Sequence, residues 1–140
     1  DFSLGLDPGY RRLFADYLRD YARSENKTVF LTSHIIQDME RLVDDCIIMD
    51  YGRILTQQPV RQLLDRVRRY TCTVAGGHSP SLADPELYHP SLLRQTLEFF
   101  SFLAPAEVEQ RLKEADVPYN GLQSETVNLE DAFIGLTGKY

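Results

Sequence analysis

The sequence has little of what would mark a secreted or membrane-spanning protein. Two cysteines in 140 residues are too few for the disulfide framework of a small secreted domain, so we expect Cys46 and Cys72 to be reduced, buried thiols. A membrane-spanning helix needs about 20 apolar residues in succession. The densest apolar run, residues 97–106, is far shorter than that and contains Glu98.

Basic surface and metal-ligand patterns are lacking as well. Lys and Arg number 15 against 21 Asp and Glu, which gives a formal net charge of -6. The basic residues are interleaved with acidic ones, whereas a nucleic-acid-binding domain normally shows a basic patch, so we expect no nucleic-acid partner. His78 and His89 share a loop rich in Gly and Pro, but no cysteine or carboxylate set gives a metal-ligand spacing, and we expect no metal site.

Hydrophobic residues make up 43% of the chain, enough to form a core and to exclude wholesale disorder. In residues 1–67, helical patterns alternate with short apolar runs, which predicts an α/β layer with mostly parallel strands. Asp7-Pro8 has the residue types of a helix start. We expect a helix after Pro8, a buried strand at 27–32, a helix at 35–43, a strand at 46–49, a hairpin return at 53–56 and a helix from Pro59.

The pattern changes near Arg68, where we place a domain boundary between residues 1–67 and 68–140. The second part predicts a β-β-α-β-α order, a small α+β unit. We expect strands at 69–74 and 121–127, a long strand or a strand pair at 92–103, a loop at 76–91, a helix from Pro105, and a last helix at 129–136 that Asn128 caps and Gly138 closes. We interpret the aromatic side chains as core residues: Phe14, Tyr17, Phe99, Phe100 and Phe102.

One histidine stands where a predicted buried strand meets the start of a helix, in the segment VFLTSH at 29–34. In open α/β sheets, ligands bind beyond the carboxyl ends of the strands, and a helix N-terminus there favours phosphate. The imidazole of His34 could donate a hydrogen bond to a phosphate oxygen or position a water. On local sequence alone, a histidine that caps or packs near the helix end is the better explanation.

A second motif stands 27 residues before His34 and changes this balance. GLDP at 5–8, an amphipathic helix, KTVFLTSH at 27–34 and DDCIIMDYGRI at 44–54 follow one another in this order. Together they resemble the nucleotide-binding domain of ATP-binding cassette (ABC) transporters. Gly5-Leu6-Asp7 is similar to its D-loop, and Thr32-Ser33-His34 is similar to its switch-histidine loop.

The resemblance covers residues 1 to about 65. At the other end of the chain, LEDAFIGLTG at 129–138 is similar to the closing helix of many bacterial members that carry a C-terminal extension. A generic amphipathic helix would also explain this segment.

The resemblance implies roles for the motif residues. In the family, two cassettes clamp two ATP molecules, the switch histidine contacts the γ-phosphate, and the D-loop aspartate crosses the dimer interface. Carried over, His34 is a catalytic residue, and Asp7, Gly5, Leu6 and Ser33 are nucleotide or dimer contacts.

Asp1 is a second catalytic candidate. It falls six residues before Asp7, where the family usually has the glutamate that polarises the attacking water. Aspartate is shorter by one methylene, so the resemblance implies slower hydrolysis with Asp1 in that role.

The family's phosphate-binding loop is missing, because no G-x-x-x-x-G-K-[ST] motif occurs in the sequence. The signature motif and the Q-loop are missing too. We therefore interpret the chain as the C-terminal remnant of a P-loop NTPase (ABC ATPase) domain followed by a small α+β extension. ATP and Mg would be cofactors of the full-length parent, and we expect the fragment alone to be inactive and to bind neither.

The resemblance also implies partners and a location. The parent would couple ATP hydrolysis to transport across a membrane, together with transmembrane permease subunits and a second ATP-binding subunit. It would be cytoplasmic, at the inner face of the membrane. We expect the fragment to self-associate, because apolar strands without the rest of their core expose edges. The alternative is a non-enzymatic α/β binding or regulatory module in which His34 is structural.

Overall fold

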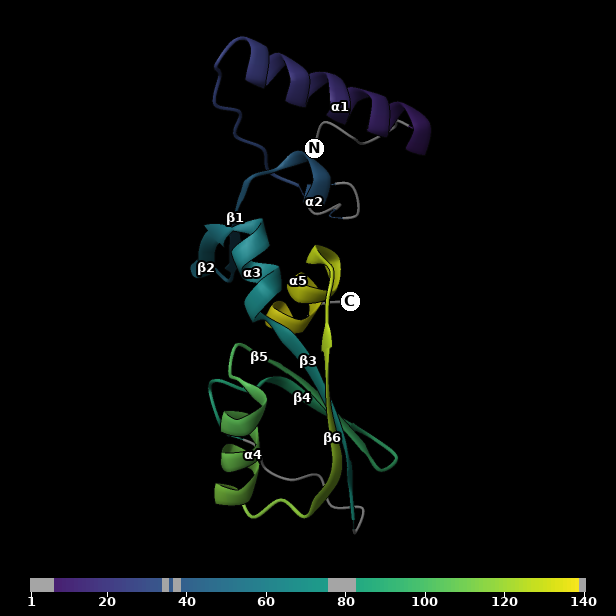
Figure 1. Ribbon diagram of the computed structural model, residues 1–140, viewed down its shortest axis with the longest axis vertical. Coiled ribbons are helices and arrows are strands. Elements are labelled where there is room, and N and C mark those ends of the chain that lie inside the picture. Colours follow the sequence, from purple (N-terminus) through teal and green to yellow (C-terminus); the bar gives the residue numbers. More distant parts are fainter. Residues whose placement is uncertain (1–6, 34–35, 37–38, 76–82, 139–140) are drawn as a thin grey trace. The chain divides into compact units, whose positions relative to one another are not determined.

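A computed structural model of the chain describes residues 7–33, 36, 39–75 and 83–138. It consists of two compact units, residues 1–44 and 45–140 (Figure 1). Among the described residues, no helix is long and apolar enough to cross a membrane.

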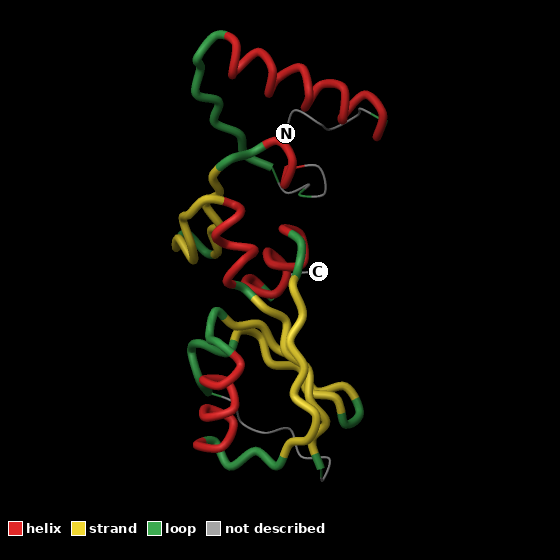
Figure 2. Tube along the Cα trace, in the orientation of Figure 1, coloured by secondary structure: helices red, strands yellow, loops and turns green. Residues whose placement is uncertain are grey.

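The first unit contains two helices and the second contains three helices and six strands, all counted within the described residues (Figure 2). In chain order they are α1 (Pro8–Ser24), α2 (Met39–Leu42), β1 (Asp45–Asp50), β2 (Arg53–Pro59), α3 (Val60–Arg66), β3 (Arg68–Val74), β4 (Tyr88–Leu93), β5 (Thr96–Ser101), α4 (Pro105–Glu114), β6 (Tyr119–Thr126) and α5 (Leu129–Thr137).

Helix α1 starts where the sequence predicts, but its apolar stripe is not buried. No residue of α1 is buried in this structure, and Phe14 and Tyr17 are 38% and 69% exposed. The prediction that these two aromatic side chains are core residues is therefore wrong for this chain. The amphipathic period was correct as a helix signal, but no layer in the described residues covers the stripe.

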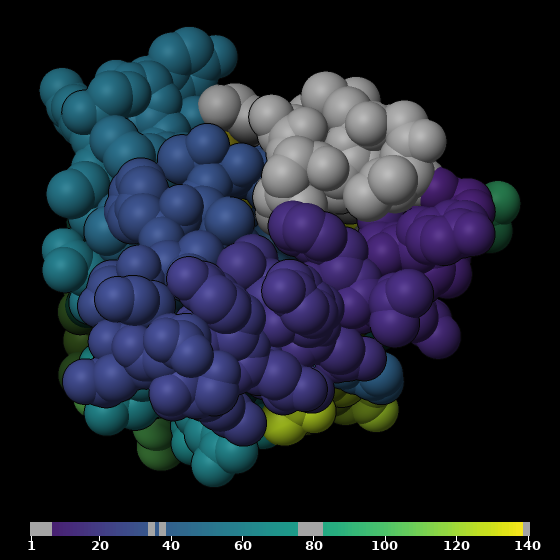
Figure 3. All heavy atoms as spheres, turned by 90° about the horizontal axis from the view of Figure 1, so that it is seen from above, coloured from purple at the N-terminus to yellow at the C-terminus, as the bar shows by residue number. Residues whose placement is uncertain are grey.

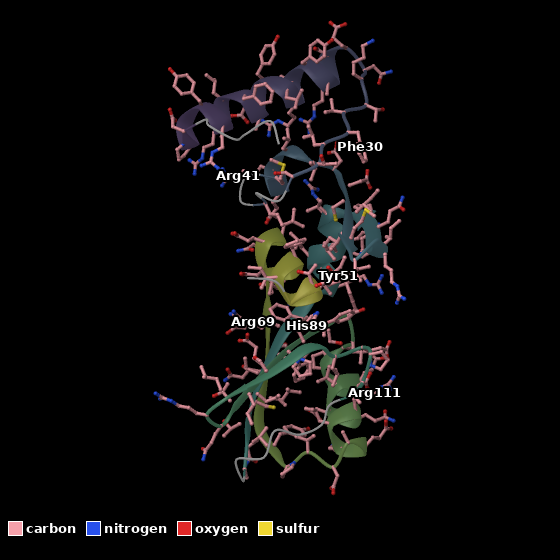
Figure 4. All side chains as sticks on the ribbon, turned by 180° about the vertical axis from the view of Figure 1, so that it is seen from behind. Phe30, Arg41, Tyr51, Arg69, His89 and Arg111 are labelled. Atoms are coloured by element: carbon pink, nitrogen blue, oxygen red, sulfur yellow. The ribbon has the colours of Figure 1, made fainter. Side chains whose placement is uncertain are left out.

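The strand predicted at 27–32 is also absent: these residues are irregular, and Phe30 is 80% exposed (Figure 4). A strand is stable only when neighbouring strands complete its hydrogen-bond ladder and another layer covers it. In the part of the chain that the structure describes, nothing pairs with this segment. Of the helix predicted at 35–43, the structure contains Met39–Leu42, and most of the preceding residues lie outside the described part.

Strands β1 and β2 form the predicted hairpin. Tyr51 and Gly52 connect them with φ angles of 43° and 75°. A two-residue turn with positive φ at both positions matches the right-handed twist of the flanking strands, and glycine adopts such an angle without steric cost. Ile48 of β1 is buried, as are Val60 and Leu63 of α3, the helix that follows the hairpin.

A four-stranded sheet in the order β4-β5-β3-β6 forms the centre of the second unit, and every pairing in it is antiparallel. The structure is thus a mixed α/β arrangement with two antiparallel sheets. The expectation of mostly parallel strands is wrong for the described strands. Parallel neighbours need long crossover connections, whereas β1–β2 and β4–β5 are joined by two-residue turns.

The segment at 92–103, predicted to be a long strand or a strand pair, belongs to a strand pair whose first strand starts earlier. Arg94, with a φ of 58°, stands in the turn that divides β4 from β5. The start of β4, Tyr88 to Pro90, was predicted to belong to a loop, because proline and glycine are common in residues 76–91. Pro90 is accommodated because β4 is an edge strand, where one backbone donor can be lost.

Alternate side chains of the sheet pack against two different helices. Tyr70 and Phe99 stack with ring centroids 5.5 Å apart, in one cluster with Val108 and Leu112 of α4. Phe100 points to the opposite face of β5, where a side chain at Gly135 of α5 would overlap its ring. The prediction of core positions is confirmed for Phe99 and Phe100, while Phe102 is half-buried.

A buried serine holds the chain between β5 and α4. The Ser101 hydroxyl, fully buried, donates to the carbonyl of Glu86 at 2.7 Å and accepts the Leu103 amide at 3.1 Å. Arg111 of α4 adds an ion pair to Glu86 at 2.6 Å (Figure 4). These contacts fix the segment before β4 against the end of β5 and against the last turn of α4.

The Ser101→Ala variant should be destabilised by about 2 kcal/mol, because the part-buried Glu86 carbonyl and Leu103 amide lose their hydrogen-bond partner. Urea unfolding followed by circular dichroism measures this change. Ser91→Ala, at an exposed position of β4, is the control and should stay within about 0.5 kcal/mol of the parent chain. Equal stability of the two variants would contradict the bridging role.

Candidate functional site: the D-loop and switch-histidine segments

Two of the six predicted site residues, Asp7 and Ser33, lie in the described part of the chain. Asp1, Gly5, Leu6 and His34 lie outside the described residues. The roles of the two motifs therefore remain predictions.

Asp7 is the N-cap of α1. Its Oδ1 accepts hydrogen bonds from the backbone N–H groups of Gly9 at 2.9 Å and Tyr10 at 3.1 Å. Pro8 has no N–H, so these two amides are the first donors of the helix, and neither has a partner within the helix. One carboxylate oxygen satisfies both of them, and its negative charge stands at the positive end of the helix dipole.

The other end of α1 is also closed by a specific turn. Asn26 adopts a left-handed φ of 49°, and the Lys27 amide donates to the Ala22 carbonyl at 2.8 Å. Asparagine is one of the few residues that adopt this conformation readily, so it can end the helix much as glycine does. The two caps give α1 a defined length of 17 residues between the two motifs.

Helix α1 is linked to α2 through Arg19. Its guanidinium donates to the carbonyl of Arg41 at 3.5 Å and forms an ion pair with Asp16 at 2.9 Å. The sequence pattern did not predict this link, because a solvent-facing arginine on a helix gives no signal for its partner 22 residues away. The contact connects the helix after the D-loop motif to the helix after the switch-histidine motif.

Several apolar side chains of α1 are exposed to solvent. Figure 3 shows the atoms of α1 at the surface, and the side chains of Leu13, Tyr17 and Tyr10 are each more than 60% exposed. An exposed apolar surface of this size is normally covered by another layer of the protein or by a partner.

Metal-ligating side chains do not cluster among the described residues. They contain no group of three or more His, Cys, Asp or Glu side chains that could hold a metal ion. Burial raises the pKa of the Cys46 and Cys72 thiols, which keeps both protonated and makes them poor metal ligands or nucleophiles. Both cysteines are free; the predicted burial is confirmed for Cys72, whereas Cys46 is half-buried.

Comparison with known proteins identifies the relationship. No family model matches the chain. It is 31% identical over 141 residues to the Nod factor export ATP-binding protein I of Rhizobium meliloti, across 98% of this chain. The proteins of the same name from Rhizobium etli and Neorhizobium galegae are 30% and 28% identical, also across 98% of the chain. The chain is a relative of ABC-transporter ATP-binding subunits.

The chain spans about two fifths of the length of these relatives, 41%, 43% and 40% respectively. The similarity crosses the predicted boundary at residues 67 and 68. These ATP-binding proteins therefore share both the segment that carries the motifs and the segment that forms the four-stranded sheet.

Replacing Asp7 by alanine should destabilise the start of α1 by about 1 kcal/mol, because the amides of Gly9 and Tyr10 lose their acceptor. Amide hydrogen exchange of the first turn would rise accordingly. Asp7→Asn is the matched control: its side-chain oxygen can still cap the helix, so exchange should stay close to that of the parent chain. Faster exchange in both variants to the same extent would show that capping is not the role of this side chain.

Proposed function

We propose that the chain is the C-terminal part of an ABC-transporter ATP-binding subunit. Residues 1–67 correspond to the end of a P-loop NTPase domain, and residues 68–140 correspond to a C-terminal extension. The observation that carries the proposal is the similarity to ATP-binding proteins over 98% of the chain, together with the two ordered motifs. The parent couples ATP hydrolysis to transport across a membrane.

In the parent, His34 contacts the γ-phosphate and Asp7 reaches across to the second subunit. Asp7 can combine this contact with its capping role, because Oδ1 makes both cap hydrogen bonds and no donor in the described residues binds the other oxygen. Gly5, Leu6 and Ser33 position these two side chains.

The length of α1 supports a meeting of the two motifs. Its 17 residues extend about 26 Å at the helical rise of about 1.5 Å per residue. The seven residues of 27–33, if extended in the parent, span about 23 Å at about 3.3 Å per residue. A strand returning alongside the helix would therefore bring Ser33 back to the level of Asp7.

ATP and Mg are cofactors of the parent rather than of this chain, since the phosphate-binding loop is missing from the sequence. Asp1 has the position of the residue that polarises the attacking water. The partners are transmembrane permease subunits and a second ATP-binding subunit, and the relatives' names favour export as the direction. In this proposal the parent works at the cytoplasmic face of the membrane.

The exposed stripe of α1 supports this proposal over the alternative, a complete non-enzymatic α/β module. A self-contained module would cover its apolar residues, whereas Leu13 and Tyr17 are 65% and 69% exposed. In the parent, the preceding part of the ATPase domain covers them. In the isolated chain the same stripe favours self-association.

The deciding observation is the gene sequence ahead of Asp1. A G-x-x-x-x-G-K-[ST] motif about one domain length upstream, roughly 100–150 residues, is expected. A reading frame without this motif would favour the binding module.

The chain of residues 1–140 should bind no Mg-ATP, because the loop that cradles the phosphates is missing. Isothermal titration of the chain with Mg-ATP should give only the heat of dilution. The full-length parent is the positive control in the same buffer. A micromolar dissociation constant for the chain alone would contradict the proposal.

In the full-length parent, His34→Gln should lower the ATPase rate about 100-fold, because one group that stabilises the transferring phosphoryl is lost. Steady-state phosphate release measures the effect. His89→Asn is the matched control: His89 lies in β4, its φ is 47°, and asparagine tolerates that angle. The control should keep the parental rate, and an equal loss in both variants would show a general structural effect.

A further inference from the structure

Helix α5 is enclosed along its whole length. All nine of its residues are buried or half-buried. The buried positions include Leu129, Ala132 and Leu136, which are spaced three and four residues apart and therefore share one face of the helix. On a helix that packs against one element only, the opposite face is exposed to water. Helix α5 must therefore contact more than one element of the second unit.

The first of these elements is the four-stranded sheet. Helix α5 contacts β4 and β5, and two glycines allow the close approach. A side chain at Gly135 would overlap the ring of Phe100 in β5, and a side chain at Gly138 would overlap the imidazole of His89 in β4. The helix is therefore fitted to this face of the sheet, and a larger residue at either position would displace it.

The second element is α3, which lies between the β1–β2 hairpin and α5 (Figure 1). Val60 and Leu63 of α3 are 4% and 0% exposed, and Ile48 of β1 is also buried. Outside the hairpin, α5 is the main described element that packs against α3. Helix α5 therefore contacts both the sheet and residues 45–66, which we call the hairpin–α3 segment.

The hairpin–α3 segment is too small to be stable by itself. A two-stranded hairpin is at best marginally stable in water, and α3 has 7 residues, whereas an isolated helix needs about 12–15. Ile47, Met49 and Ile54 of the hairpin are exposed and add little to its burial. Arg66 at the end of α3 lies over the ring of Phe102, 5.9 Å from its centroid, and such a contact contributes little at an exposed site. The packing of α5 on α3 is thus the main interaction that keeps this segment in place.

The opposite face of the sheet does not depend on α5. There Tyr70 and Phe99 pack in one cluster with Val108 and Leu112 of α4. Helices α3 and α5 contribute none of the described residues of this cluster. The two helices that cover the sheet, α4 and α5, can therefore be loosened separately.

We propose that α5 is a clasp that couples the hairpin–α3 segment to the four-stranded sheet. While α5 is docked, both parts belong to one compact unit, residues 45–140. When α5 lifts from the sheet, the hairpin–α3 segment loses its cover and opens, although the two are far apart in the sequence. The sheet keeps its layer with α4 during this opening.

In the proposed parent the clasp joins the ATPase domain to its extension, because residues 45–67 belong to the first and the sheet belongs to the second. This statement rests on the proposed function, whereas the coupling itself involves no nucleotide. A negative result in the experiments below would leave the proposed function intact. A reading frame without the phosphate-binding loop would likewise leave the clasp intact.

Amide hydrogen exchange of the full chain with Gly135→Ala tests the clasp. Alanine is a better helix former than glycine, so any loosening comes from overlap with the Phe100 ring and not from a weaker helix. Exchange in α5, β1, β2 and α3 should rise about tenfold, while exchange in α4 should stay within about twofold. Val108→Ala, which loosens α4, is the matched control. It should raise exchange in α4 and leave the hairpin–α3 segment within about twofold of the parent chain.

A chain that ends at Asn128 removes α5 outright and tests the same point without relying on the overlap at position 135. Amides of its hairpin–α3 segment should exchange at nearly unprotected rates, while those of α4 stay protected. Unchanged exchange of the hairpin–α3 segment in this shortened chain would overturn the proposal. An equal rise in β1, β2, α3 and α4 would also overturn it, because α5 would then support the whole unit and not the hairpin–α3 segment in particular.

Discussion

The second unit depends on one apolar layer between the sheet and α4. Tyr70 and Phe99 lie side by side on adjacent strands and are fully buried, with Val108 and Leu112 of the helix above them. Each such side chain contributes roughly 1.5–3 kcal/mol when removed from water. The Tyr70 hydroxyl stays in this layer because it donates to the Leu103 carbonyl at 2.7 Å. The strand order, the tight turns and the connection into α4 together bring these side chains into contact.

The first unit shows what happens when such a layer is incomplete. Helix α1 has good caps at both ends, through Asp7 and Asn26, and these are local interactions that need no partner. Its apolar stripe and the segment that follows it have no cover in the described residues, and the segment forms no strand. Local chemistry thus suffices for a helix, whereas a strand requires neighbours.

The difference between local and non-local constraints explains which sequence-based predictions were successful. Asn128 and Gly138 were assigned as caps of α5, and Asn128 accepts from the Asp131 amide while Gly138 adopts a φ of 67°. The Tyr51-Gly52 turn was found for the same reason. The direction of the strands and the start of β4 were not predicted correctly, because both depend on which distant segments of the chain pair. For the candidate site, the motifs and their resemblance to a known family proposed Asp7 and His34. Of these two, only Asp7 has a described environment, and the Arg19 link to α2 left no trace in the sequence.

The close approach of α5 to the sheet has a consequence for synthesis of the chain. Phe100 fits beneath this helix only because position 135 has no side chain. The ribosome releases α5 after all the strands, so a nascent sheet exposes an aromatic ring until the last helix has emerged. During that interval the ring is an apolar surface that chaperones can recognise. Translation that stops before Gly135 would leave this aromatic ring without its covering helix.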